Sequence, residues 1–141
     1  MKIVLDSNVL VAALLSPYGS PAQVLQMLLT EQAQLCYDAR ILSEHRAVLA
    51  RPKFGFDPEP IAALLDYLEK MGILAATSPL PVTLPDPDDE MFLEVALASH
   101  ADHLVTGNLR HFPAHRRCGV SVVSPAELIR LSRADSPPGV E

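Results

Sequence analysis

Short apolar runs alternate along the chain with longer segments in which apolar residues recur every three or four positions. Runs of the first kind are typical of buried β-strands, and spacing of the second kind is typical of amphipathic α-helices. The predicted strands cover residues 2–5, 35–37, 73–76, 104–106 and 120–123. The predicted helices cover residues 9–15, 21–29, 41–49, 60–71, 88–97 and 125–131. Because strands alternate with helices, the pattern predicts an α/β fold with a parallel sheet covered by helices on both faces.

Specific residues mark two helix starts and one long connector. Ser20 and Ser124 are followed three positions later by Gln23 and Glu127, which is the spacing of a capping box. The connector at residues 77–87 holds four prolines, which suit neither a regular helix nor a central strand.

The length of 141 residues suits one compact domain. We place this domain at residues 1–132 and expect the polar residues 133–141 to form a flexible C-terminal tail. Hydrophobic residues make up 49% of the chain, which favours a sizeable core and a homodimer or another bound partner. We expect Cys36 and Cys118 to be buried free thiols, since no Cys/His spacing indicates zinc.

The apolar N-terminal segment is interrupted by Asp6, and no small-residue cleavage site follows it. We therefore expect a buried strand and helix there, not a signal peptide. No apolar stretch is long enough to cross a bilayer. The sequence predicts a soluble, cytoplasmic protein without a membrane partner.

The formal net charge is −6, from 11 Lys and Arg against 17 Asp and Glu. A chain this acidic does not attract nucleic acid through its overall field, so the charge argues against a DNA-coating protein. Any contact with nucleic acid must depend on a local basic patch or a bound cation.

Several oxygen-bearing side chains fall where a parallel sheet places its ligand site, outside the carboxyl ends of the strands. Asp6 follows the first strand and Asn108 follows the fourth, whereas placing Glu44 and Asp89 there requires an assumed topology. Singly, each has a structural explanation: Asp6 as a helix cap, Asp89 as a complement to a helix dipole, Glu44 on a solvated face and Asn108 as a turn former. Together they predict a site for Mg²⁺ or Mn²⁺, because clustered carboxylates repel unless a hard cation neutralises them. Such a cation can drive phosphodiester hydrolysis without a protein nucleophile.

Four segments give the chain a family resemblance over residues 2–131. They are I-V-L-D-S-N-V-L at 3–10, E-H-R-A-V-L-A-R-P-K-F at 44–54, D-P-D-D-E-M-F-L at 86–93 and L-V-T-G-N at 104–108. In this order and spacing they resemble the PIN domain, in the branch described as VapC-like ribonucleases, the toxin components of toxin–antitoxin pairs.

The resemblance implies a three-layer α/β/α sandwich whose five parallel strands have the order 3-2-1-4-5. It also implies a metal-dependent endoribonuclease that acts on RNA and has a cognate antitoxin. Its catalytic and metal-binding residues would be Asp6, Glu44, Asp89 and Asn108. Its supporting residues would be Ser7, which would orient Asp6 or a metal-bound water, and Thr106, which would hydrogen-bond within the site.

Position 108 departs from the family pattern, because many relatives have Asp there and this chain has Asn. An amide oxygen can ligate a cation but brings no charge. We therefore expect one tighter metal site at Asp6 and Asp89 and a weaker second site, with Asp86 or Asp88 as compensating ligands.

Two basic groups flank the predicted site and are candidate contacts for RNA phosphates. The first consists of Arg46, Arg51 and Lys53, and the second begins with Arg110 and His111. Arg116 and Arg117 fit a phosphate contact and an ordinary solvated loop equally well. A zinc site at His111 and His115 carries little weight, because Pro113 excludes a helical spacing. The remaining histidines are expected at the surface or at helix ends: His45, His100 and His103.

Two other functions are compatible with the sequence. The chain could be a degenerate PIN domain that binds RNA or a partner without cutting, as Asn108 allows. Less favoured is an aspartyl-phosphate phosphotransferase or receiver with Asp6 as acceptor. Such sites pair the Asp with a Lys near the carboxyl end of the sheet, and Lys2, Lys53 and Lys70 do not follow a late strand.

Overall fold

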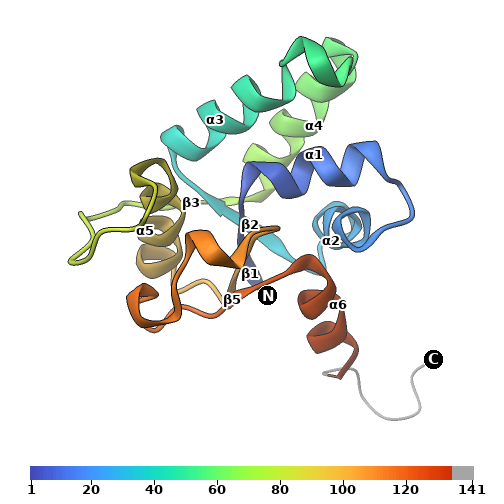
Figure 1. Ribbon diagram of the computed structural model, residues 1–141. Helices are drawn as coiled ribbons and strands as arrows, with labels where there is room; N and C mark the ends of the chain where they lie inside the picture. The colour runs from blue at the N-terminus through green and yellow to red at the C-terminus, as the bar shows by residue number, and fades with distance from the viewer. Residues whose placement is uncertain (135–141) are drawn as a thin grey trace.

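A computed structural model describes residues 1–134. Its five strands form one parallel sheet in the order β3-β2-β1-β4-β5, which confirms the predicted topology (Figure 1). The strands are β1 (Lys2–Leu5), β2 (Gln34–Tyr37), β3 (Ile73–Leu74), β4 (His103–Val105) and β5 (Val122–Val123). In the register, Leu5 lies beside Val105, and Val105 lies beside Val123. The carboxyl ends of β1, β4 and β5 therefore meet at one edge of the sheet.

Six α-helices and four short 3₁₀ helices connect and cover the strands within the described residues. The α-helices are α1 (Ser7–Leu15), α2 (Ser20–Leu29), α3 (Ala39–Leu49), α4 (Pro58–Met71), α5 (Glu90–Ser99) and α6 (Pro125–Ala134). The 3₁₀ helices are η1 (Pro52–Phe54), η2 (Pro87–Asp89), η3 (Leu109–His111) and η4 (Ala114–Arg116). Each predicted helix is present, with its ends shifted by a few residues.

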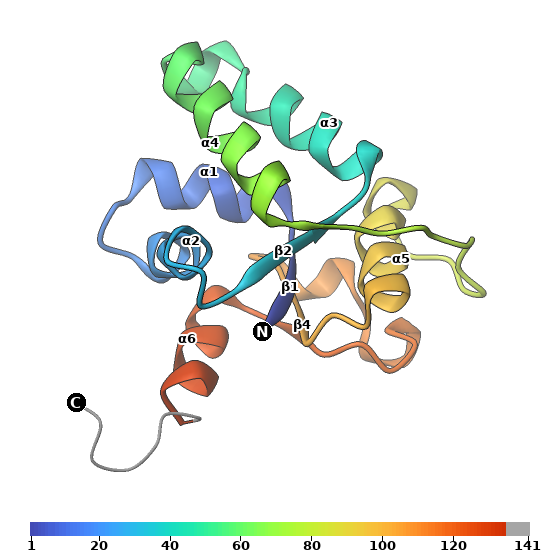
Figure 2. The ribbon, with the colours of Figure 1, turned by 180° about the vertical axis from the view of Figure 1, so that it is seen from behind.

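The sheet separates two hydrophobic cores, because alternate residues of a strand point to opposite faces. Ile3 and Leu5 pack on one face with residues of α1, α2, α4 and α6. Val4 packs on the other face with α5 and with Phe112. Figure 2 shows α5 on one side of the strands and α1 and α2 on the other. This is the predicted three-layer arrangement.

The two capping boxes behave differently. The Ser124 hydroxyl accepts a hydrogen bond from the Glu127 amide at 3.1 Å, so the cap of α6 is confirmed. The cap at Ser20 is wrong, because α2 begins at Ser20 itself and Gly19 is its N-cap residue, without a side-chain cap bond. Asp57 caps α4 through the Glu59 amide, which starts that helix two residues before the predicted Pro60.

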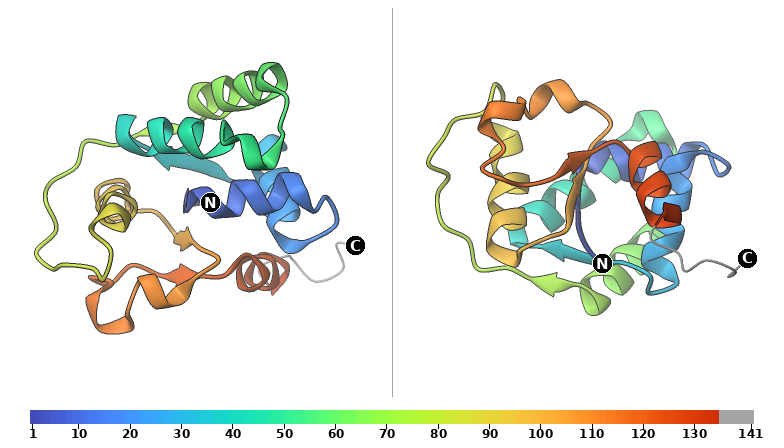
Figure 3. Two further views of the ribbon diagram at one scale, coloured as in Figure 1. Left: turned by 45° about the horizontal axis from the view of Figure 1, so that its top comes forward. Right: turned by 90° about the horizontal axis from the view of Figure 1, so that it is seen from below.

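The proline-rich connector runs around the outside of α5 (Figure 3). Two glutamates of α5 hold it: Glu94 accepts from the Leu80 amide at 3.2 Å, and Glu90 accepts from the Leu84 amide at 3.1 Å. Arg116 donates to the Thr83 carbonyl at 2.6 Å. The connector therefore has a fixed path although it lacks regular structure.

Three further expectations concern the termini, the cysteines and membranes. Helix α6 continues past the domain boundary at residue 132 to Ala134, and the remainder of the predicted tail, 135–141, lies outside the described residues. Cys36 is buried as predicted, but Cys118 is exposed, because it lies in the loop after η4 and not in a core-facing strand. Within residues 1–134, no helix is both long enough and apolar enough to span a bilayer.

Candidate metal centre

Asp6 lies directly after β1, and its backbone is fixed against β4. Its amide donates to the Val105 carbonyl at 2.9 Å. One carboxylate oxygen, Oδ1, accepts from the Asn8 amide at 3.3 Å, so Asp6 is also the N-cap of α1. The other, Oδ2, accepts from the buried Thr106 hydroxyl at 3.0 Å. Thr106 therefore hydrogen-bonds within the site, and Asp6 is buried with both oxygens oriented.

Glu44 reaches the same region from α3, through a contact with Ser7 on α1. The Ser7 hydroxyl lies 2.5 Å from Glu44 Oε2 and donates to it. The partner of Ser7 among the acids is thus Glu44, whereas the resemblance led us to expect that Ser7 would orient Asp6 or a metal-bound water. The reason is the start of α1: Ser7 is its first residue, and its side chain points away from the cap bond of Asp6 toward α3.

Asp89 stands at the junction of η2 and α5, where an aspartate ordinarily caps the helix. Its side chain makes no cap hydrogen bond. Oδ2 is buried and has no hydrogen-bond donor among the described residues. Nδ1 of His111 lies 3.2 Å from Oδ2, within ion-pair distance but outside hydrogen-bond geometry. A buried carboxylate oxygen without a donor is costly, so this one needs an explanation beyond the local fold.

The charge of Asp6 acts on both Glu44 and Asp89, and the charge of Glu44 also acts on Asp89. The pKa of Asp89 is raised from 3.8 to about 6, chiefly by burial and also by the charges of Asp6, Asp86 and Glu44, while His111 acts to lower it. Burial also raises the pKa of Glu44, which is raised again by Asp6 and Asp88 and lowered by the Ser7 hydrogen bond and Arg51. Acids from three separate elements therefore share one region of negative potential.

The donor set suits a hard divalent cation. Carboxylate oxygens are the ligands that Mg²⁺ and Mn²⁺ prefer, and a cation would satisfy the buried Oδ2 of Asp89. Within residues 1–134, however, no group of three or more His, Cys, Asp or Glu side chains is gathered closely enough to hold a metal ion as it stands. The acids are neighbours without forming a complete coordination shell.

Asn108 is engaged in local structure. Its Oδ1 accepts from the Arg110 amide at 3.2 Å, which makes it the N-cap of η3. Its side-chain Nδ2 lies 3.1 Å from His111 Nε2. Its backbone N–H donates to the Thr106 hydroxyl at 3.1 Å. Asn108 therefore places His111 beside Asp89, and ligation of a cation would use the second lone pair of its oxygen.

The predicted basic groups differ in how free they are. Arg46 lies 3.3 Å from Glu69 and 3.8 Å from Asp66, both on α4. Lys53 lies over the Phe54 ring. Arg51 is exposed and close enough to Glu44 to lower its pKa.

The second basic group is partly structural. Arg117 donates to the Phe112 carbonyl at 2.8 Å, and Arg116 holds the connector through Thr83. Arg110 is exposed, beside Asn108. His115 contacts Arg116, while His111 faces Asp89, so the two histidines have different partners. Arg51 and Arg110 are thus exposed basic residues, Arg51 near Glu44 and Arg110 beside Asn108.

Sequence reasoning missed His45, which was expected at the surface or at a helix end. Its side chain is 0% exposed, and burial lowers its pKa to about 4, so the ring is neutral at pH 7. Nδ1 lies 2.7 Å from the Ser7 hydroxyl, and the ring stacks on Phe92. Its helical spacing could have revealed it, because position 45 follows Ile41 by four and precedes Val48 by three, on the buried face of α3.

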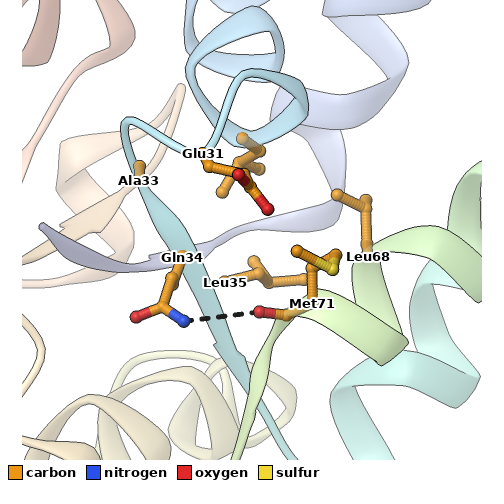
Figure 4. A pocket seen from close by; sticks show the side chains of 7 residues that line it. Glu31, Ala33, Gln34, Leu35, Leu68 and Met71 are labelled. Atoms are coloured by element: carbon orange, nitrogen blue, oxygen red, sulfur yellow. Dashed lines mark hydrogen bonds between the residues drawn. The ribbon is translucent and has the colours of Figure 1, made fainter.

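A separate cavity of about 140 Å³ lies at the opposite end of the sheet, where β2 begins (Figure 4). It is lined mostly by apolar residues of α2, β2 and α4, and Gln34 crosses it to the Met71 carbonyl at 3.5 Å. Glu31 is the only ionisable residue in its lining. Since the cavity lacks converging polar groups, the acidic edge of the sheet is the stronger candidate site.

Comparisons with solved structures agree with the fold. VapBC2 from Rickettsia felis bound to a DNA fragment from their promoter matches with a TM-score of 0.58 and 18% identity, over 88% of this chain and 98% of that chain. FitAB bound to an IR36 DNA fragment matches with a TM-score of 0.60 and 18% identity, over 87% and 94%. VapBC-1 from nontypeable Haemophilus influenzae matches with a TM-score of 0.57 and 14% identity, over 89% and 99%. At these identities the likeness concerns the fold.

The sequence itself gives the family. Among curated protein sequences, none matches the chain. The sequence profile described as PIN domain, in contrast, matches residues 2–110, which include Asp6, Glu44, Asp89 and Asn108. The chain belongs to the PIN-domain family.

Proposed function

We propose that the chain is a Mg²⁺- or Mn²⁺-dependent endoribonuclease whose cation is held by Asp6, Glu44 and Asp89. The observation that carries the proposal is that Asp6 lies close enough to both Glu44 and Asp89 for its charge to raise the pKa of each, in addition to the larger effect of burial. The buried Oδ2 of Asp89, which lacks a donor, supports it further. Membership in a family whose members are typically metal-dependent nucleases agrees with this chemistry.

A divalent cation bound here would supply Lewis-acid stabilisation of the phosphodiester and would lower the pKa of an attacking water. Other residues of the protein orient the carboxylates that would hold this cation. Thr106 orients Asp6, Ser7 orients Glu44, and α5 presents Asp89. Full coordination requires these carboxylates to turn toward a common point, and their repulsion without a cation is the reason to expect that movement. Asn108 would be a supplementary ligand, with Asp86 or Asp88 as compensating ligands.

Contacts with RNA would come from the exposed cations around the acidic edge. Arg51 and Arg110 are the best placed, and His111 lies beside Asp89. Arg46 and Lys53 contribute less, because each already has a partner within the chain. Contacts of this kind address phosphate and sugar and carry no sequence preference.

We further propose that the chain is the toxin of a toxin–antitoxin pair and acts in the cytoplasm as a homodimer. The fold likeness to VapBC2, FitAB and VapBC-1 supports a cognate antitoxin as partner. Such a partner would cover the acidic site with basic and apolar side chains. Two of those three relatives were solved with DNA fragments, so a DNA-binding antitoxin is the natural expectation here.

The nuclease proposal is tested by incubating a defined single-stranded RNA with the protein and Mn²⁺, with EDTA as the metal control. Asp6→Asn and Asp89→Asn each keep the shape of the side chain and remove its charge. Each should lower the cleavage rate by more than about 100-fold, since loss of even an outer ligand partner costs about 10–100-fold. Circular dichroism should be unchanged. Undiminished cleavage by both variants would refute the assignment.

A non-catalytic PIN domain is the second candidate, and Asn108 favours it because it brings no charge and caps η3. It predicts RNA binding without cleavage under any metal. A phosphoryl acceptor at Asp6 is less supported. Lys2 lies against the Ser99 carbonyl, and Lys53 lies over Phe54. Absence of phosphoryl-mimicking fluoride at Asp6 would count against that alternative.

A further inference from the structure

A chain of three side chains links α1 to two consecutive residues of α3. The Ser7 hydroxyl lies 2.5 Å from Glu44 Oε2 and 2.7 Å from His45 Nδ1. Neither Ser7 nor His45 is exposed beyond 3%. Within residues 1–134, Ser7 provides the only side-chain hydrogen bond to Glu44. The orientation of the Glu44 carboxylate therefore depends on the direction in which the Ser7 proton points.

The chemistry of the three groups fixes that direction. An ionised carboxylate can only accept hydrogen bonds, so at 2.5 Å the Ser7 hydroxyl must donate to Glu44. The hydroxyl has one proton, so toward His45 it can only accept. His45 Nδ1 must then carry the proton of the neutral ring and donate it to Ser7 Oγ.

The surroundings of His45 favour the same tautomer. Nε2 is buried and has no hydrogen-bond partner among the described residues. With the proton on Nδ1, the single N–H of the ring is used in the single hydrogen bond that the ring makes. With the proton on Nε2, that N–H would be buried without an acceptor, and the single Ser7 proton could serve only one of the two acceptors, Glu44 and His45 Nδ1.

We propose that His45 is a positioning residue for Glu44, acting through a one-way hydrogen-bond chain from His45 Nδ1–H to Ser7 and from Ser7 to Glu44. The chain holds the carboxylate toward the acidic edge of the sheet and leaves its other oxygen for a ligand. The cation that this oxygen would meet rests on the proposed function. The hydrogen-bond chain itself does not.

The tautomer can be measured directly by ¹⁵N NMR of the full-length protein with labelled histidine, at pH 8 and without metal. We expect His45 Nδ1 to have the chemical shift of a protonated ring nitrogen and Nε2 that of an unprotonated one. The opposite pattern would overturn the proposal. Because this measurement needs neither cation nor RNA, its failure is distinguishable from failure of the nuclease proposal.

Substitutions of His45 test whether this hydrogen-bond chain positions Glu44. His45→Leu fills the space without a donor, whereas His45→Asn keeps an amide N–H near the place of Nδ1–H. We expect His45→Leu to weaken Mn²⁺ binding by about 10–100-fold and His45→Asn to retain most of the affinity. Mn²⁺ binding is followed by electron paramagnetic resonance. Equal losses in both variants would indicate a packing role alone and would overturn the proposal.

A double-mutant cycle with Ser7→Ala distinguishes an effect transmitted through the hydrogen bonds of Ser7 from a general loss of structure. If His45 acts only through Ser7, the double variant Ser7→Ala/His45→Leu should bind Mn²⁺ no more weakly than Ser7→Ala alone. Additive losses would mean that His45 affects the site by another route, against the proposal.

Discussion

At the scale of single residues, the candidate site is defined by side chains that do something other than the sequence alone suggests. Asp6 caps α1 and also receives a hydrogen bond from Thr106. Asp89 stands where a cap is expected but does not cap α5. Because a buried acid that makes no cap bond weakens the fold, Asp89 is better explained by a ligand than by stability.

The raised pKa of Asp89 gives a pH-dependent stability. The folded protein holds the Asp89 proton up to about pH 6, whereas the unfolded chain releases it near 3.8. Ionisation of Asp89 therefore costs no folding stability below pH 3.8. The free energy of unfolding then decreases as the pH rises from 3.8 to 6. Asp89→Asn, which resembles the protonated acid, should make the metal-free protein more stable than wild type at pH 7–8, by on the order of 3 kcal/mol.

Urea denaturation of both proteins in EDTA, at several pH values, measures this difference. The two curves should converge near pH 4. Added Mg²⁺ should stabilise the wild type and leave Asp89→Asn nearly unchanged, because only the ionised acid gains from the cation. A variant less stable than wild type at pH 8 would contradict the expectation.

If the acidic edge binds cations, we expect Asn108 to limit how many of them bind. Asn108→Asp would add a fourth acidic group to Asp6, Glu44 and Asp89, so we expect tighter Mn²⁺ binding and a second equivalent in the titration. Isothermal titration calorimetry compares the two proteins. Identical affinity and identical stoichiometry in the two proteins would refute the expectation of a weaker second site with Asp86 or Asp88 as compensating ligands.

At the scale of elements, the site depends on how α1, α3 and α5 meet the sheet. Ser7 joins α1 to α3, and the ring of His45 stacks on Phe92 of α5. The opposite end of the sheet is held by a close approach of α4 to β2. A Cβ atom at Gly72 would lie 2.6 Å from the Leu35 carbonyl oxygen and 2.7 Å from that of Leu68.

Gly72→Ala should therefore destabilise the protein, because both contacts are with backbone atoms that cannot easily move. We expect a loss of about 1–3 kcal/mol, as for other overpacked positions. Gly107→Ala is the matched control, since a Cβ there meets nothing within 4 Å and should change stability by less than about 0.5 kcal/mol. Thermal unfolding compares the two, and equal melting temperatures would contradict this account of Gly72.

At the scale of the whole molecule, a net charge of −6 surrounds a site proposed to bind a polyanion. Arg46, which lies against Glu69 and Asp66, adds little to a local positive field. Arg51 is exposed and lies close enough to Glu44 to lower the pKa of that carboxyl. Binding of RNA would then depend on few cations and would weaken with salt.

This difference can be measured with Arg51→Gln and Arg46→Gln as a matched pair, both in an Asp6→Asn background. Arg51→Gln should reduce the slope of log affinity against log salt by about 0.7, the value for one contact to a single strand. Arg46→Gln should leave the slope unchanged. Fluorescence anisotropy with labelled RNA measures both, and equal slopes for the two variants would exclude a distinct role of Arg51.

The elements and family of this protein could be predicted from its sequence, because both depend on local patterns. Apolar runs gave β1, β2 and β4 almost to the residue, and four motifs identified a PIN domain with the strand order found. Asp6 and Asn108 could be placed because each directly follows a strand. Helix starts were less certain, since the cap of α2 depends on which residue turns first.

Only the tertiary structure decided how the side chains are shared. Ser7 pairs with Glu44 and Thr106 with Asp6, although both serine and threonine could have reached either acid in principle. His45 is buried because α3 packs against both α1 and α5, so that a polar residue falls on its inner face. A hydrogen bond between residues 37 positions apart depends on how packed elements are oriented, which no local pattern of the chain contains.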